Sequence, residues 1–235
     1  MIDGEIALAC GGGPAEAAFP ASALDGGVTP YDATAIEEAL DALAVEAGMD
    51  APQPLQGVPA SEAGWFVLSE TLEVVHVAVG DWSRTNPQEY GDISVTLERE
   101  DDSLRAVGWG NCQLMPALAD EWTFWANLGA PDATPEATSL DLQVVERSCT
   151  GARAPDDFLR EPVVVETDED VTVYWASGYF VGDPPADTDN LGWDCPSNPF
   201  VTRTVPLEAP LGDRAVLDGS FWPPRDVRGV DVSDL

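Results

Sequence analysis

The sequence predicts a mainly β protein with one helix, in which a small α+β domain is followed by a β-sandwich-like domain. Two observations predict this fold class. Many short runs of β-branched and aromatic residues lie between acidic or proline-containing turns, and only one stretch has helical periodicity. The chain has 235 residues, 44% of them hydrophobic, and eight are tryptophans. A chain of this length and composition is large enough to bury two cores.

The predicted helix begins near Thr34 and ends at Gly48. Thr34 and Glu37 have the spacing of a capping box, in which a hydroxyl and a carboxylate bind free N–H groups of the first helical turn. Apolar residues then recur every three or four positions from Ile36 to Ala47. Gly48 supplies the left-handed residue at which many helices end.

Two β-hairpins are predicted after the helix. Residues 65–69 and 74–79 form the first, and residues 93–98 and 104–109 form the second. The helix lying on this four-stranded antiparallel meander would make a complete small α+β domain.

The second half of the chain contains further strand-like runs that no helical pattern interrupts. This arrangement favours a β-sandwich. The runs are residues 140–146, 163–167, 171–176, 201–207 and 215–217.

Stretches rich in glycine, alanine and proline predict where the domains end. We expect an N-terminal arm or linker at 1–31, the α+β domain at 32–128, a linker at 129–138, the β-sandwich-like domain at 139–224 and a C-terminal tail at 225–235. For residues 129–136, a long loop inside one sandwich is an equal alternative to a linker.

The chain is strongly acidic, with 43 acidic and 10 basic residues and a net charge of −33. Every basic residue is an arginine. A GC-rich genome or adaptation to high salt would each explain this composition, and a surface that collects divalent cations or basic partners is a third explanation. The charge repels nucleic acid and anionic membranes, so neither is an expected partner. No apolar run approaches the roughly 18 residues of a membrane span.

The four cysteines indicate disulfide bonds rather than a metal site. Cys10, Cys112, Cys149 and Cys195 are even in number and show no C-x-x-C spacing. Three connectivities are open, and pairing of near neighbours within the expected domains favours Cys10 with Cys112 and Cys149 with Cys195. Reduced, buried cysteines in a cytosolic protein are the alternative.

Cys10 has a second interpretation. Small apolar residues precede it and a run of glycines follows it, as at the end of a bacterial lipoprotein signal, so Cys10 is a candidate for lipidation and a possible lipid anchor. The short acidic segment before it lacks the basic and hydrophobic regions of a working signal. An ordinary structural cysteine is the other interpretation.

The sequence carries no recognisable catalytic motif and predicts no cofactor. No G-x-S-x-G motif is present, and the single histidine, His76, lies in an alternating strand on the face opposite Val75 and Val77. The abundant carboxylates leave a glycosidase-like acid and base pair open. Four oxygen-bearing residues form a candidate calcium site: Asp183, Asp187, Asp189 and Asn190.

Five segments together resemble a group of uncharacterised secreted or lipoprotein-type proteins of GC-rich actinobacteria. The resemblance covers roughly residues 105–224 and implies an exported protein in which Cys149 and Cys195 pair. It implies no activity. The segments are residues 108–112, 146–151, 161–166, 195–199 and 210–219.

The sequence therefore predicts a non-catalytic binding or structural protein that is secreted or associated with the cell envelope. A carboxylate-based hydrolase or a calcium-dependent binding module is the alternative. We also expect Arg214 to pair with an acidic neighbour and so fix the strand that follows it.

Overall fold

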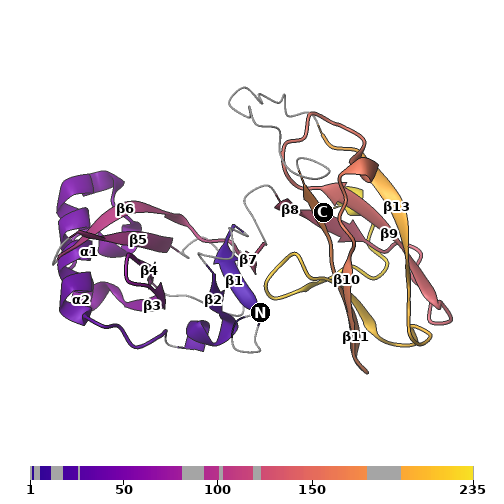
Figure 1. The fold of residues 1–235 in the computed structure, drawn as a ribbon, viewed down its shortest axis with the longest axis horizontal. Helices are drawn as coiled ribbons and strands as arrows, with labels where there is room; N and C mark the ends of the chain where they lie inside the picture. The colour runs from indigo at the N-terminus through magenta and orange to yellow at the C-terminus, as the bar shows by residue number, and fades with distance from the viewer. Residues whose placement is uncertain are drawn as a thin grey trace. The chain divides into compact units, whose positions relative to one another are not determined.

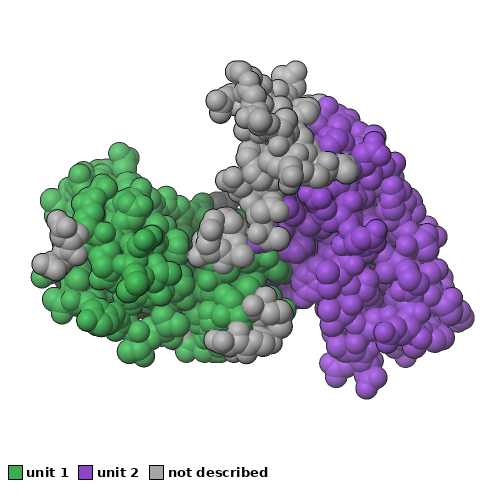
Figure 2. All heavy atoms as spheres, in the orientation of Figure 1, with its two compact units in different colours: residues 1–117 green, residues 118–235 purple. Residues whose placement is uncertain are grey.

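The structure is a computed structural model that describes residues 2, 6–11, 18–25, 27–80, 93–100, 103–118, 123–178 and 197–234. The chain divides into two compact units, residues 1–117 and 118–235 (Figure 2). Each unit contains its own cluster of buried apolar residues. The predicted fold class, mainly β with one main helix, is confirmed.

Unit 1 combines a four-stranded antiparallel sheet, a three-stranded antiparallel sheet and two helices (Figure 1). Both predicted hairpins are present in the larger sheet, whose strand order is β3-β4-β5-β6. The helices and strands of unit 1 are β1 (Ala7–Cys10), β2 (Phe19–Pro20), α1 (Ala33–Ala47), α2 (Ala60–Ala63), β3 (Trp65–Glu70), β4 (Val74–Val79), β5 (Ile93–Glu100), β6 (Ser103–Asn111) and β7 (Leu114–Pro116).

Helix α1 packs its apolar face on one side of the larger sheet (Figure 1). Ile36 and Leu40 are fully buried there with Val75 and Val77. The helix begins two residues earlier than the capping box predicts. Asp32 is the N-cap, and its Oδ1 accepts a hydrogen bond from the N–H of Ala35 at 3.0 Å.

The expected N-terminal arm is instead part of unit 1. Strand β1 pairs with β2 on one side and with β7 on the other, and Leu8 and Phe19 are buried. The sequence concealed this sheet because β1 has only four residues and its partner β7 lies about a hundred residues further along the chain.

Unit 2 contains two four-stranded sheets, ordered β10-β11-β14-β15 and β12-β8-β9-β13. Its core joins residues of both sheets, as in a sandwich. Its strands are β8 (Thr123–Gly129), β9 (Ser139–Glu146), β10 (Val163–Glu166), β11 (Asp170–Tyr174), β12 (Ala176–Gly178), β13 (Phe200–Pro206), β14 (Ala215–Asp218) and β15 (Arg225–Asp226).

The chain passes directly from one sheet of unit 2 to the other at Trp175, between β11 and β12. On the side of β8 that faces β12, the pairing ends at Trp125, so no described strand lies beside Leu128 there, whereas β9 pairs with Leu128 on the other side. The buried carboxylate of Asp218 accepts the N–H of Leu128 at 3.0 Å and so satisfies a donor that would otherwise be unpaired.

The predicted domain limits need two corrections. Strand β8 pairs with β9, so residues 129–138 connect a hairpin of unit 2 and are not an interdomain linker. The boundary lies at 117/118. The expected C-terminal tail also belongs to unit 2, since β15 pairs with β14 and Val227 is buried.

In the described part of the chain, no helix is long and apolar enough to cross a membrane.

Candidate functional site

Unit 2 has a groove of about 680 Å³ between β10 and β13. These two strands are the edge strands of the two sheets, and among the described residues each pairs with a neighbour on one side only. The groove is therefore bordered by two strand edges. Its volume lies within the range of small-ligand sites.

The floor of the groove is apolar. Leu159, Val164, Trp175 and Val205 line it, and all four pack in or against the core of unit 2. The indole Nε1–H of Trp175 donates to the backbone carbonyl of Arg160 at 2.8 Å, which fixes the ring where the chain changes sheets. The floor is thus held by the fold and does not depend on a ligand.

Two of the four carboxylates at the groove are held by arginines. Asp156 is bound by Arg203. Glu166 receives a hydrogen bond from Arg214 at 2.7 Å and another from the N–H of Glu208, also at 2.7 Å. The predicted pairing of Arg214 with an acidic neighbour is confirmed. Burial alone would raise the pKa of Glu166, but these donors outweigh it and lower the pKa.

The other two carboxylates have no side-chain partner in the described part of the chain. Glu161 lies two residues before β10, and Glu208 lies two residues after β13. Because the N–H of Glu208 binds Glu166, Glu208 lies beside the C-terminal residue of β10. The two unpaired carboxylates therefore flank the two ends of β10.

A buried ion pair supports the same unit. The Glu146 side chain is fully buried, and the Arg153 guanidinium binds both of its oxygens, with Nε at 3.1 Å from Oε2. Arg153 also donates to the carbonyl of Gly178 at 2.6 Å and lies over the ring of Phe158. This side chain thus ties the end of β9 to the end of β12.

The loop that contains Cys149 is fixed by one asparagine. The amide of Asn198 donates to the carbonyls of Glu146 and Ser148 at 2.7 and 2.6 Å and accepts from the hydroxyl of Thr150 at 2.8 Å. Cys149 is disulfide-bonded. Its expected partner, Cys195, lies outside the described residues.

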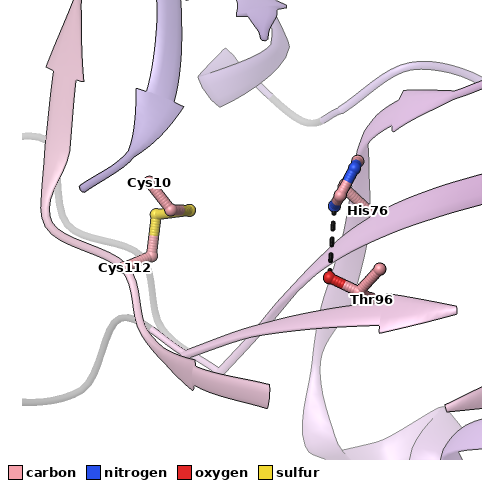
Figure 3. Close-up of a disulfide and its surroundings, with 4 residues drawn as sticks. All are labelled: Cys10, His76, Thr96 and Cys112. Atoms are coloured by element: carbon pink, nitrogen blue, oxygen red, sulfur yellow. Dashed lines mark hydrogen bonds between the residues drawn. A yellow bond between two sulfur atoms is a disulfide. The ribbon is translucent and has the colours of Figure 1, made fainter. Parts of the chain in front are cut away.

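The expected disulfide between Cys10 and Cys112 is present, with the Cα atoms 4.6 Å apart (Figure 3). It joins the end of β1 to the residues just before β7 and so closes the smaller sheet. None of the described cysteines is free. Lipidation of Cys10 would need the sulfur that the disulfide uses.

His76 has the surroundings of a structural residue. It is half-buried, on the opposite face of β4 from the valines that contact α1, and burial lowers its pKa. Its Nδ1 lies 3.4 Å from the hydroxyl of Thr96 on β5 (Figure 3). Within the described residues no carboxylate binds the ring, so the orienting partner of a catalytic histidine is missing there.

The candidate calcium ligands Asp183, Asp187, Asp189 and Asn190 lie outside the described residues. Within the described ranges, no cluster of three or more histidine, cysteine, aspartate or glutamate residues has metal-binding geometry.

Sequence reasoning missed the groove, although its charged residues border strands that the sequence predicts. Glu161 precedes β10 and Glu166 is its last residue, and Arg203 and Glu208 lie in and after β13. The missing information was that β10 and β13 are both edge strands, which depends on the order of strands in the sheets.

No protein-family model, curated protein sequence or solved structure matches the chain. The actinobacterial resemblance stays a prediction.

Proposed function

We propose that this chain is a non-catalytic binding protein that works outside the cytoplasm, and that the groove between β10 and β13 is its binding site. The proposal rests on the arginine partners of two groove carboxylates and on the pKa of one of them. A glycosidase needs one carboxyl group with a raised pKa as its general acid. At the groove, Asp156 and Glu166 each bind an arginine, and the pKa of Glu166 is lowered. These carboxylates are suited to holding structure and charge.

The export part of the proposal is supported by the disulfides. Cys10 is bonded to Cys112, and Cys149 is also disulfide-bonded. Disulfides persist in extracellular and envelope compartments and are rare in the cytosol of mesophiles. The anionic surface also fits a site for partners that carry positive charge.

Two measurements test the proposal. Non-reducing peptide mapping of protein isolated from the cell envelope and medium of its host should yield the peptides of Cys10 and Cys112 linked. Diacylglycerol on Cys10 would instead make the protein a lipid-anchored one, and four free thiols would contradict export.

The second measurement is hydrolase activity on a panel of polysaccharides and glycosides. The purified protein should show no turnover. Turnover that disappears in a Glu161→Gln/Glu208→Gln variant would overturn the non-catalytic function and favour a carboxylate-based hydrolase.

A further inference from the structure

We propose that the groove binds an extended, positively charged segment of a partner protein, which pairs with the free edge of β10. This inference rests on the proposed function and adds to it the class of ligand and the way in which it binds. Three features of β10 and its surroundings carry it: unpaired backbone groups, an apolar floor and carboxylates at both ends.

The first feature is the direction of the backbone groups of β10. Thr167 donates its N–H to the carbonyl of Asp170, so these two residues form a hydrogen-bonded pair. Val164 pairs with Val173 three residues further along each strand, an odd number of steps from that bonded pair. The carbonyl of Val173 accepts from Gly219, on the side of β14. Because antiparallel pairs alternate between bonded and unbonded, the N–H and C=O of Val164 point away from β11.

These outward groups are available for a strand. No backbone hydrogen bond of Val164 to another part of the chain is found among the described residues, and no described strand pairs with that edge. An unpaired edge is the template on which proteins bind extended peptides by strand addition.

The second feature is the floor below this edge. The side chain of Val164 points into the groove beside Val205 and Trp175. Side chains alternate along a strand, so a peptide on this edge directs every second side chain to the floor. Apolar residues at those positions of the ligand would be buried there.

The third feature is charge. Glu161 and Glu208 flank the two ends of β10 and have no side-chain partner in the described structure, whereas Arg203 is already neutralised by Asp156. The net charge of −33 attracts a basic segment and repels a second copy of this chain. A seven-residue strand spans about 20 Å between its end residues, which suits lysines reaching both carboxylates.

The test uses the whole oxidised protein and a seven-residue peptide with lysine at both ends and alternating valine and threonine between them. Titration followed by fluorescence anisotropy and by amide shifts should show saturable binding that moves the signals of residues 163–166 and weakens with salt. The same peptide with glutamate at both ends should not bind. A version N-methylated on the residues that face β10 should not bind either, since it cannot pair with the edge.

Variants of the protein separate charge from strand pairing. Glu161→Gln/Glu208→Gln should weaken binding roughly fivefold, as expected for two exposed charge pairs. The matched control is Glu38→Gln/Glu46→Gln on α1, which removes two exposed carboxylates from unit 1 and should change binding less than about twofold. Val164→Pro removes the outward N–H at a position where an edge strand tolerates proline, and should abolish binding.

Equal binding of the lysine and glutamate peptides, or binding that survives both N-methylation and Val164→Pro, would overturn the inference. So would sedimentation showing a dimer of the free protein that Val164→Pro converts to a monomer, because a second copy would then occupy the edge. An exported, inactive protein that binds none of the peptides would refute this inference alone. Hydrolysis that depends on Glu161 and Glu208 would refute the proposed function itself.

Discussion

Among the described ion pairs, that of Glu146 and Arg153 is the most deeply buried, with exposed side-chain fractions of 0% and 11%. Removing one partner of a buried pair leaves the other charge without compensation. The pair also lies next to the loop of Cys149 and joins the ends of β9 and β12, two strands of one sheet, so its loss should loosen that sheet.

We predict that Arg153→Ala lowers the free energy of unfolding by about 3–5 kcal/mol, because it leaves the Glu146 carboxylate buried and unpaired. Urea denaturation of the whole chain measures the loss. Arg105→Ala is the matched control, since the Arg105 and Glu100 side chains are 57% and 53% exposed, and it should cost less than about 1 kcal/mol. Equal losses in the two variants would show that burial does not determine how much these ion pairs contribute to the free energy of unfolding.

Glu166 should make stability depend on pH. Its pKa is lower in the folded protein than in the unfolded chain, so its stabilising contribution is present above the unfolded pKa of about 4.3 and is lost as the pH falls through the folded pKa. Glu166→Gln should therefore be less stable than the wild type at pH 7, and the two should converge in acid.

Chemical denaturation at a series of pH values from neutral to acid measures this difference. The control is Glu161→Gln, which removes a carboxylate without a side-chain partner from the same groove and should change stability at neutral pH by less than about 0.5 kcal/mol. A Glu166→Gln deficit that stays constant into strong acid would contradict the assigned role of the Arg214 and Glu208 donors.

At the scale of elements, α1 shows how a sequence pattern can identify a helix and misplace its start. The capping box of Thr34 and Glu37 is a valid local signal, but Asp32 lies two residues earlier with an extended φ of −140° and its carboxylate already binds the third N–H of the helix. Tertiary packing of Ile36 and Leu40 fixes the register of the helix, and Asp32 then falls at the cap position.

Asp32→Ala should destabilise the protein by about 1 kcal/mol, because one N–H of the first turn loses its acceptor. Thr34→Ala should cost nothing measurable, since Thr34 is exposed inside the helix and alanine is the better helix former. Thermal or urea unfolding followed by the far-UV signal measures both variants. A larger loss in Thr34→Ala would restore the capping box as the true start of the helix.

At the scale of the whole molecule, structure formed by neighbouring segments of the chain could be predicted from the sequence. Pairings between segments that lie far apart in the sequence could not. The hairpins of β3 with β4 and β5 with β6 are local, and alternation of valines fixed their faces. The pairing of β1 with β7, the parallel pairing of β11 with β14, and the position of β10 and β13 at sheet edges all depend on contacts across long sequence separations. The groove belongs to the second kind, which is why its residues carried no signal in the sequence.

The division at 117/118 gives a last prediction, that residues 1–117 and 118–235 fold separately. Each fragment keeps its own apolar cluster and two cysteines, the bonded Cys10 and Cys112 in the first and Cys149 and Cys195 in the second. Each has about 117 residues, which is a common size for an independent domain. Oxidised fragments should each melt cooperatively, and the second should retain the peptide binding of the whole chain.

Because strand β8 supplies part of the core of unit 2, a fragment that begins at residue 139, where the sequence places the second domain, should fail to fold. Cooperative melting of that shorter fragment, or failure of the 118–235 fragment, would contradict the boundary that β8 defines.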